Sequence, residues 1–210
     1  MQLQIAFDRM PLERAVEITV AVAEHADWIE VGTSLIKQYG MEAVRRVVAA
    51  ADGRPVLADL KTADDAAFEF ALAFDAGAAS ATVLALAADS SIDTAVRVAA
   101  ERGLEAVIDL MNVPEARCAA LAARLPAPVV LAAHIGKDAQ GAGADPAALL
   151  GDWALGRRVA VAGGLTVDRV GALHGAGDMR IIVGSAITGS PDPVTAARAF
   201  SDAVEERGNT

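Results

Sequence analysis

Residues 55–65 read Pro-Val-Leu-Ala-Asp-Leu-Lys-Thr-Ala-Asp-Asp, and this stretch is the most informative part of the chain. Three apolar residues lead into Ala58-Asp-Leu-Lys-Thr-Ala-Asp64, which holds two carboxylates and one amine. Side chains two apart in a strand face the same way, so we expect Asp59 and Lys61 to project together from a strand end. Asp64 then lies at a predicted helix start, where the helix dipole favours negative charge. Because such a cluster is costly to bury without partners, the stretch predicts either a functional site or a solvated loop.

Comparable short apolar runs recur along the whole chain and alternate with alanine-rich stretches of helical spacing. The sequence predicts helices over Leu12–Glu24, with Leu12, Val16, Val20 and Ala23 on one face, and over Ser91–Ala100, with Ile92, Val96 and Ala99 on one face. Helix starts are predicted near Pro11, Asp64, Ser90, Pro114 and Pro193, and glycine ends at Gly77, Gly103 and Gly177. Strands are predicted at Gln2–Phe7, Trp28–Val31, Pro55–Ala58, Ala81–Leu84, Ala106–Ile108, Val129–Ala132, Arg158–Val161 and Arg180–Val183.

Eight strands alternating with helices in 210 residues predict an α/β fold, a single (β/α)₈ TIM barrel spanning residues 1–210. A doubly wound open sheet is the competing architecture. The glycine-rich segment Gly136–Asp145 is the longest loop-like stretch, and loops of this kind in barrels often cover an active site.

Composition limits the class of protein. A net charge of −10 and a pI near 4.7 argue against a nucleic-acid partner, which would require a basic face. No apolar run approaches the ~18 residues of a membrane span. The start lacks the basic and apolar regions of a signal peptide, and the single Cys118 fits a reducing compartment. We therefore expect a cytoplasmic protein with no membrane partner.

Ionisable side chains gather where the predicted strands end. A barrel places its chemistry at the C-terminal strand ends, and reading those ends in order gives Asp8, Glu30, Asp59 with Lys61, Asp109 and His134. His25 and His174 lie elsewhere and are expected at the surface. A single acid after a strand is commonly a helix cap, but this many ionisable groups on one rim predict an active site.

Turns that contain glycine follow the last two predicted strands. Gly163-Gly164 and Gly184-Ser185 leave backbone amides open after strands seven and eight, where barrels commonly hold a phosphate. The plainer reading is a tight turn that needs positive φ. Two such turns at these two ends favour a phosphorylated ligand.

Acids without a cysteine or histidine cluster favour a hard cation, so Glu30 and Asp59 are predicted to bind Mg²⁺ together with water and substrate oxygens. Lys61 between carboxylates is expected to stay charged and to stabilise an enolate electrostatically. His134, whose ordinary pKa is near neutral, is the predicted proton-transfer residue.

These residues resemble the orotidine 5′-monophosphate decarboxylase suprafamily. The resemblance rests on Asp8, Glu30, the Asp59-x-Lys61-x-x-Asp64 motif, His134 and the two glycine turns, and it spans Leu3-Gln-Ile-Ala-Phe-Asp8 to Gly184-Ser-Ala-Ile-Thr188. Glu30 stands where orotidine decarboxylase itself has a lysine. A glutamate there is similar to the Mg²⁺-dependent branch of 3-hexulose-6-phosphate synthase and 3-keto-L-gulonate-6-phosphate decarboxylase, and the resemblance implies that Glu30 and Asp59 bind the cation.

Two activities within that branch compete. Thr62 after the lysine, and Asp109, resemble the synthases, which join formaldehyde to D-ribulose 5-phosphate through a Mg²⁺-stabilised enediolate. His134-Ile-Gly-Lys-Asp-Ala-Gln140 partly resembles the decarboxylases' His-x-x-Arg-Asp-Ala-Gln motif. Ser185 replaces an arginine common to both groups, and Lys137 is expected to compensate at the phosphate. We therefore predict a synthase-like lyase acting on a phosphorylated ketose, with the decarboxylase, or a non-catalytic sugar-phosphate-binding protein, as alternatives.

The resemblance also implies a homodimer with shared active sites. Asp64 starts a helix at the rim of the barrel, where it is able to reach a neighbouring subunit more easily than Asp59. We accordingly expect Asp64 to complete the partner's site, and Lys61 to be held by Asp8 and Asp64.

Overall fold

Eight strands alternate with helices along the chain, as the sequence predicted. The structure is a computed structural model that describes residues 1–142, 146–173 and 178–208. The strands are β1 (Gln2–Phe7), β2 (Trp28–Val31), β3 (Val56–Thr62), β4 (Ser80–Leu84), β5 (Glu105–Asp109), β6 (Val130–His134), β7 (Arg158–Ala162) and β8 (Met179–Val183). Six of the eight predicted strands differ from these bounds, five of them by only one or two residues at an end.

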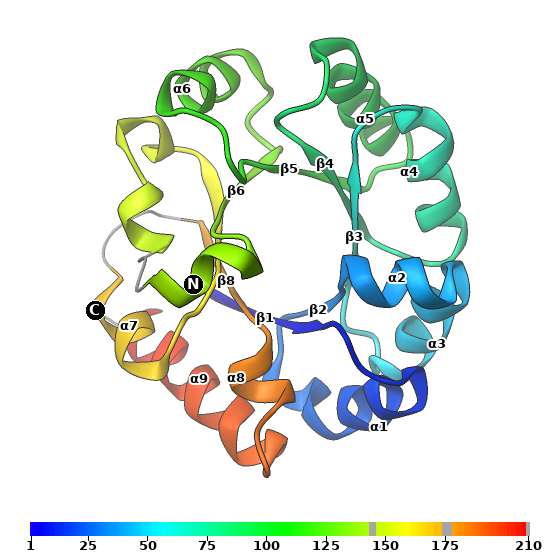
Figure 1. Ribbon diagram of the computed structural model, residues 1–210, viewed down its shortest axis with the longest axis vertical. Helices are drawn as coiled ribbons and strands as arrows, with labels where there is room; N and C mark the ends of the chain where they lie inside the picture. Colours follow the sequence, from blue (N-terminus) through cyan, green and yellow to red (C-terminus); the bar gives the residue numbers. More distant parts are fainter. Residues whose placement is uncertain (143–145, 174–177, 209–210) are drawn as a thin grey trace.

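All strand pairs are parallel, and β1 pairs with β8, which closes the barrel. This closure excludes the open doubly wound sheet. The helices form a ring outside the strands (Figure 1). They are α1 (Leu12–Val22), α2 (Thr33–Tyr39), α3 (Met41–Ala50), α4 (Ala66–Asp75), α5 (Asp89–Glu101), α6 (Glu115–Arg124), α7 (Val167–Ala172), α8 (Ser185–Thr188) and α9 (Pro193–Gly208). None of the described helices is both long and apolar enough to cross a membrane.

Side chains alternate between two environments along each strand. One set packs outward against the helices, in the large core that includes Ile5, Ile29 and Ile108. The other set points into the barrel, where small and branched residues form a second apolar cluster of Leu57, Val107, Val130, Ala132 and Ala160.

Strand β3 is longer than predicted, because pairing with β4 resumes after an irregularity. Ala58 pairs with Ala81 and Thr62 pairs with Val83, and the register shifts between these two pairs. Lys61 within the shift has φ of 50°, and its backbone N–H donates to Thr82 Oγ1 at 2.8 Å. Strand β3 therefore includes Asp59 and Lys61 of the Asp59-x-Lys61-x-x-Asp64 motif, whereas the strand was predicted to end at Ala58.

The buried face of α1 differs from the predicted one. Leu12, Ala15, Ile18, Thr19 and Val22 are buried, whereas Val20 is 65% exposed. Steps of four residues drift by about 40° around a helix, and Val20 of the predicted series faces solvent, whereas Leu12 and Ala23 of that series are buried as predicted. In α5, Ile92 and Ala99 are buried as predicted, and Val96 is only partly buried.

The predicted helix ends are largely confirmed. Pro11 and Pro114 directly precede α1 and α6, and Gly77 and Gly103 follow helices with φ of 97° and 67°. Gly177 and His174 lie outside the described residues. The His25 side chain is only 12% exposed, so its predicted surface position is wrong.

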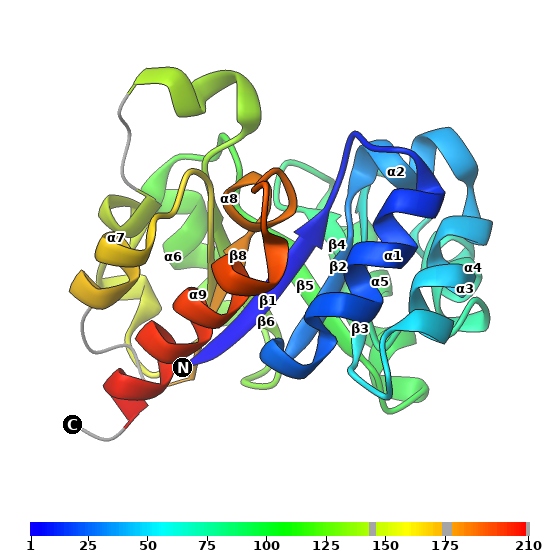
Figure 2. The same cartoon turned by 90° about the horizontal axis from the view of Figure 1, so that it is seen from below.

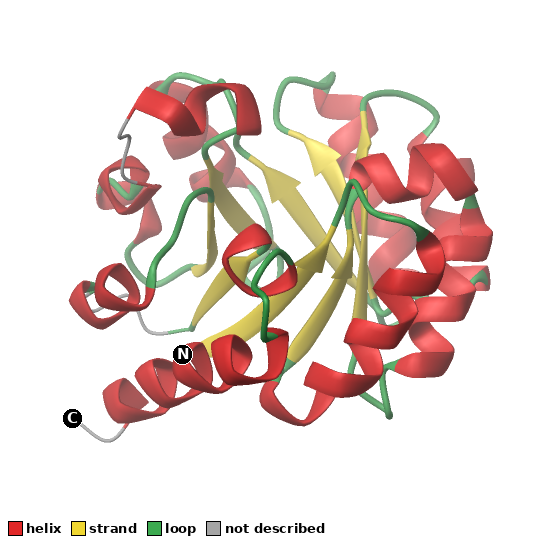
Figure 3. Cartoon of the chain, turned by 60° about the horizontal axis from the view of Figure 1, so that its bottom comes forward, coloured by secondary structure: helices red, strands yellow, loops and turns green. Residues whose placement is uncertain are grey.

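Between β6 and β7, the described residues form three short 3₁₀ helices, η2 (Lys137–Ala142), η3 (Pro146–Leu149) and η4 (Asp152–Ala154). A fourth, η1 (Ala23–His25), follows α1. The segment η2 lies on the same side of the barrel as α8 (Figure 2), at the end toward which the strand arrows point (Figure 3). The described part of the predicted loop Gly136–Asp145 thus lies over the strand ends, as predicted, while its residues 143–145 lie outside the described residues.

Candidate active site

A cavity of about 590 Å³ opens at the C-terminal ends of the strands. Eleven of the twelve predicted site residues line it, with Asp64 as the exception. The lining residues from the prediction are Asp8, Glu30, Asp59, Lys61, Asp109, His134, Lys137, Gly163, Gly164, Gly184 and Ser185. The barrel therefore brings together side chains that are as far apart as residues 8 and 185 in the sequence.

Lys61 is held between two carboxylates. Its ammonium Nζ lies 2.5 Å from Asp109 Oδ2 and 3.1 Å from Asp59 Oδ2. Burial alone would lower the pKa of Lys61, but the negative charges of Asp59 and Asp109 outweigh it and raise the pKa. Lys61 thus remains protonated. Within this chain Asp59 and Asp109, and not Asp8, pair with the ammonium, so the expected pairing with Asp8 is wrong, while the expected contact with the partner's Asp64 stays a prediction.

Asp109 joins Lys61 to His134. His134 Nδ1 lies 3.0 Å from Asp109 Oδ2, and the N–H of Met111 donates to Asp109 Oδ1 at 3.0 Å. Burial raises the pKa of Asp109, but hydrogen bonding and charge from His134 and Lys61 more than reverse this and lower it to about 2. Since Asp109 is ionised and engages Nδ1, the other ring nitrogen Nε2 is left for a substrate.

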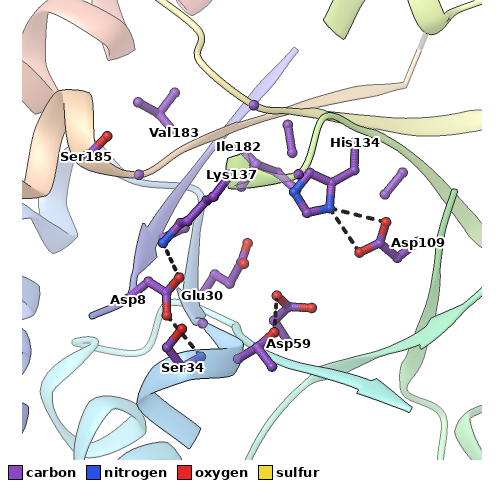
Figure 4. Close-up of a pocket in the computed structure, with 18 of the residues that line it drawn as sticks. Asp8, Glu30, Ser34, Asp59, Asp109, His134, Lys137, Ile182, Val183 and Ser185 are labelled. Atoms are coloured by element: carbon purple, nitrogen blue, oxygen red, sulfur yellow. Dashed lines mark hydrogen bonds and ion pairs between the residues drawn. The ribbon is translucent and has the colours of Figure 1, made fainter. Parts of the chain in front are cut away.

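Glu30 and Asp59 lie beside each other in the cavity (Figure 4). Burial and the charge of Asp59 raise the pKa of Glu30 to about 7, despite opposing effects from Gln4, Lys61 and His134. Within the described ranges, no three His, Cys, Asp or Glu side chains are grouped closely enough to hold a metal by themselves. Two adjacent carboxylates nevertheless match Mg²⁺, which usually takes one or two carboxylates and completes its shell with water and substrate oxygens.

Asp8 pairs with Lys137 across the cavity mouth, and its Oδ1 accepts the Ser34 N–H at 3.0 Å. Burial would raise the pKa of Asp8, but Lys137 and Ser34 together lower it. Glycine at position 32 allows the backbone before Ser34 to pack closely against Phe7 and Asp8, because a Cβ there would lie 2.7 Å from the Phe7 carbonyl oxygen and 2.9 Å from Asp8 Cβ. Lys137 therefore ties the loop after β6 to the end of β1.

The two glycine turns differ in conformation. Gly163 and Gly164 have φ of 116° and 67°, and a Cβ on Gly163 would lie 2.6 Å from the Ile135 carbonyl oxygen. Gly184 has φ of −103°, so positive φ is not its requirement. Gly184 and Ser185 open α8 at the cavity wall.

Asp64 lies outside its own cavity. Its side chain is exposed between β3 and α4, and the cap of α4 is Asp65, with φ of 50°. The next turns of α4 expose Phe68 at 60% and Leu72 at 39%. An exposed acid thus precedes a helix whose first turns expose two large apolar side chains.

Sequence reasoning missed the hydroxyl groups that hold Asp59. Thr33 Oγ1 donates to Asp59 Oδ2, and Thr82 Oγ1 donates to Asp59 Oδ1, both at 2.8 Å. Thr82 interrupts an apolar strand, and Thr33 directly follows the Gly32 turn. A hydroxyl inside the predicted strand Ala81–Leu84, and another two residues after the predicted strand Trp28–Val31, are the signals that could have identified them.

The fold and the site define a barrel enzyme class, and the chain belongs to the orotidine 5′-phosphate decarboxylase / HUMPS family, whose profile matches residues 1–200. Within it, the chain is 36% identical over 209 residues to 3-hexulose-6-phosphate synthase of Mycobacterium gastri, covering 97% of this chain and 100% of that one.

Two solved structures agree with this placement. The 3-hexulose-6-phosphate synthase from Salmonella typhimurium has a TM-score of 0.88 at 34% identity, over 98% of this chain and 99% of that one. KGPDC from Streptococcus mutans, in complex with a phosphorylated sugar, has a TM-score of 0.87 at 26% identity, over 98% and 97%. The predicted suprafamily and branch are confirmed, and the relatives with higher identity bear the synthase name.

Proposed function

We propose that this protein is an aldolase that joins formaldehyde to D-ribulose 5-phosphate, giving a hexulose 6-phosphate, and catalyses the reverse reaction. The observation that carries the proposal is the linked group of Asp59, Lys61, Asp109 and His134, in which one ammonium and one imidazole share Asp109. Similarity over nearly the full length to proteins named 3-hexulose-6-phosphate synthase supports it.

The reaction requires a proton to leave C1 of the ketose, a bond to form between C1 and the formaldehyde carbon, and a proton to reach the former formaldehyde oxygen. Lys61, fixed by two carboxylates, stabilises negative charge on the substrate oxygens. His134 carries protons through Nε2, and Asp109 fixes its ring orientation. Because Lys61 stays protonated, it serves as a charge and not as an amine nucleophile.

Glu30 and Asp59 are the residues that would hold Mg²⁺. A buried carboxyl beside a second carboxylate is unfavourable when both are ionised, and this explains why the pKa of Glu30 is raised to about 7. Bound there, the cation would supply positive charge to offset the charge that develops during enolisation.

The phosphate of the substrate is assigned to the turns at Gly163-Gly164 and Gly184-Ser185. Both turns line the cavity. Position 163 has no room for a side chain, because Ile135 packs closely against it. Lys137 reaches the same cavity but pairs with Asp8, so a contribution to the phosphate requires exchange of that partner. The sugar-phosphate complex of the S. mutans protein supports a ligand of this class.

Purified protein with Mg²⁺ tests the proposal directly. Hexulose 6-phosphate formation from formaldehyde and D-ribulose 5-phosphate is the expected result, and loss of that activity after chelation is expected too. CO₂ release from 3-keto-L-gulonate 6-phosphate without aldol product would instead favour the decarboxylase, which the His134-to-Gln140 motif supports. Tight ribulose-phosphate binding with no turnover would favour a binding protein. The single cysteine, Cys118, is a free thiol, in keeping with a proposed cytoplasmic setting.

We also propose a C₂ homodimer in which each Asp64 completes the partner's site. Asp64 is exposed and does not line its own cavity, and Phe68 and Leu72 offer apolar area one and two turns away. An isologous contact through this rim would cover both side chains and complete two equivalent sites at once.

A further inference from the structure

A series of hydrogen-bonded, buried polar side chains links the N-terminal end of the barrel to Glu30. It begins at Arg180 on β8, which is 3% exposed. Its Nη1 and Nη2 each donate to Glu105 on β5 at 3.0 Å, and its guanidinium carbon lies 3.8 Å from the centre of the Trp28 ring. The forked ion pair and the stacked ring fix the guanidinium in one orientation.

Gln4 on β1 connects this group to the cavity. Arg180 Nη1 donates to Gln4 Oε1 at 3.2 Å, and Gln4 Nε2 donates to Glu30 Oε2 at 2.5 Å. Arginine has only donors, so it requires the oxygen of the Gln4 amide to face it, and the NH₂ group must then face Glu30. Gln4 is fully buried and is the one hydrogen-bond donor to Glu30 in the described part of the chain.

We infer that Gln4 is a positioning residue for Glu30, with Arg180 setting the orientation of its amide. The hydrogen bond from Gln4 thereby holds Oε2 of Glu30, whose side chain lines the cavity (Figure 4). This inference rests on the proposed role of Glu30 as a ligand of Mg²⁺. Partners that orient a ligand carboxylate typically change metal affinity by 10- to 100-fold when they are removed.

The competing reading is that Arg180 and Gln4 serve stability alone, since the N-terminal end of a barrel usually does. The two readings predict different effects of replacing Arg158 on metal affinity: none if Gln4 orients Glu30, and a loss like that in Gln4→Met if only stability is involved. Arg158 also reaches Glu105, at 3.0 Å, and it pairs with Asp178 at 2.7 Å at the same end of the barrel. Among the described residues no hydrogen bond or ion pair joins Arg158 to Gln4, so Arg158 is a matched control for loss of an ion pair.

The experiment measures Mg²⁺ and Mn²⁺ affinity by calorimetric titration in Gln4→Met, Arg180→Lys and Arg158→Met. Methionine keeps the volume of glutamine without its amide, and lysine keeps the charge without the fork. We expect affinity to fall about 10- to 100-fold in Gln4→Met and at least several-fold in Arg180→Lys, and to stay within about twofold in Arg158→Met.

Crystal structures of metal-free wild type and Gln4→Met provide a readout that does not depend on metal binding. The Glu30 carboxylate is expected to leave its wild-type position in the variant. Unchanged Glu30 geometry and unchanged affinity in Gln4→Met would overturn the inference while leaving the proposed function intact. A wild type that binds no divalent cation would instead remove the proposed metal role, and the position of Glu30 in the variant would still decide whether Gln4 orients it. An equal loss of affinity in Arg158→Met would show that stability alone is involved.

Discussion

Replacing Glu30 with glutamine should stabilise the metal-free protein at alkaline pH. The Glu30 carboxyl has a pKa of about 7 in the folded protein, against an ordinary value of 4.5. Because the folded state holds this proton more tightly than the unfolded chain does, stability falls as the pH rises from 4.5 through 7. Each pKa unit is worth about 1.4 kcal/mol, so ionised Glu30 costs the fold about 3 kcal/mol above pH 7.

Glutamine is the neutral isostere of protonated glutamate, and its oxygen still accepts the Gln4 hydrogen bond. The stability advantage of Glu30→Gln over wild type should therefore grow by about 3 kcal/mol between pH 4.5 and pH 8. For a chain of this length, that corresponds to about 6 to 12 °C in Tm.

Urea unfolding with EDTA, at several pH values from 4.5 to 8, measures this difference, and other titrating groups cancel between the two proteins. Glu42→Gln is the control for removing a carboxylate at the surface, since Glu42 is 59% exposed and pairs only with the equally exposed Arg45 among the ion pairs of the described residues. Added Mg²⁺ should stabilise wild type at pH 8 and leave Glu30→Gln unchanged, because a ligand stabilises only the state that binds it. An advantage that is the same at pH 5 and pH 8 would refute the reasoning.

Four further predictions concern turnover and assembly. Lys61→Ala should lower kcat by about 10² or more, the scale of losing one preorganised donor, and steady-state kinetics that differ from wild type by less than about twofold would contradict its role. His134→Ala should slow exchange of the C1 proton of ribulose 5-phosphate with solvent deuterium, followed by NMR; undiminished exchange would count against it. Crystals soaked in sulfate should show the anion between the Gly163 turn and Ser185, and an anion bound only near Lys137 would argue otherwise. Mixed Asp64→Ala and Lys61→Ala subunits should regain activity, because each heterodimer then holds one intact pocket; no recovery despite proven subunit exchange would exclude sharing in trans.

The sequence predicts the strands and the rim residues because both depend on local pattern. Short apolar runs with polar residues at their ends identify the C-terminal rim, and barrel closure brings those ends together. Asp59 and Lys61 project together as their spacing implies, and their side chains meet at 3.1 Å.

The pairings within the site are not predictable from spacing alone. Lys61 meets Asp109, which lies 48 positions away, because strands β3 to β5 bring both to one level of the barrel. The sequence alone suggests Asp8 as a partner of Lys61, but Asp8 instead pairs with Lys137, which lies 129 positions away. The bulge at Lys61 and the buried face of α1 likewise depend on packing against neighbouring elements, which the local periodicity of the sequence does not predict.

The pairing of β1 with β8 has a consequence for synthesis on the ribosome. Residues 2–5 find their second neighbour only at residues 180–183, so the first strand emerges long before its last partner. At 5 to 20 residues per second, that interval is roughly 10 to 35 seconds. Throughout it, one edge of β1 lacks its partner, and an unpaired edge is able to associate with other nascent chains. Asp8 likewise waits for Lys137 and Gln4 for Arg180, so these contacts around the pocket form only after much of the chain has been made.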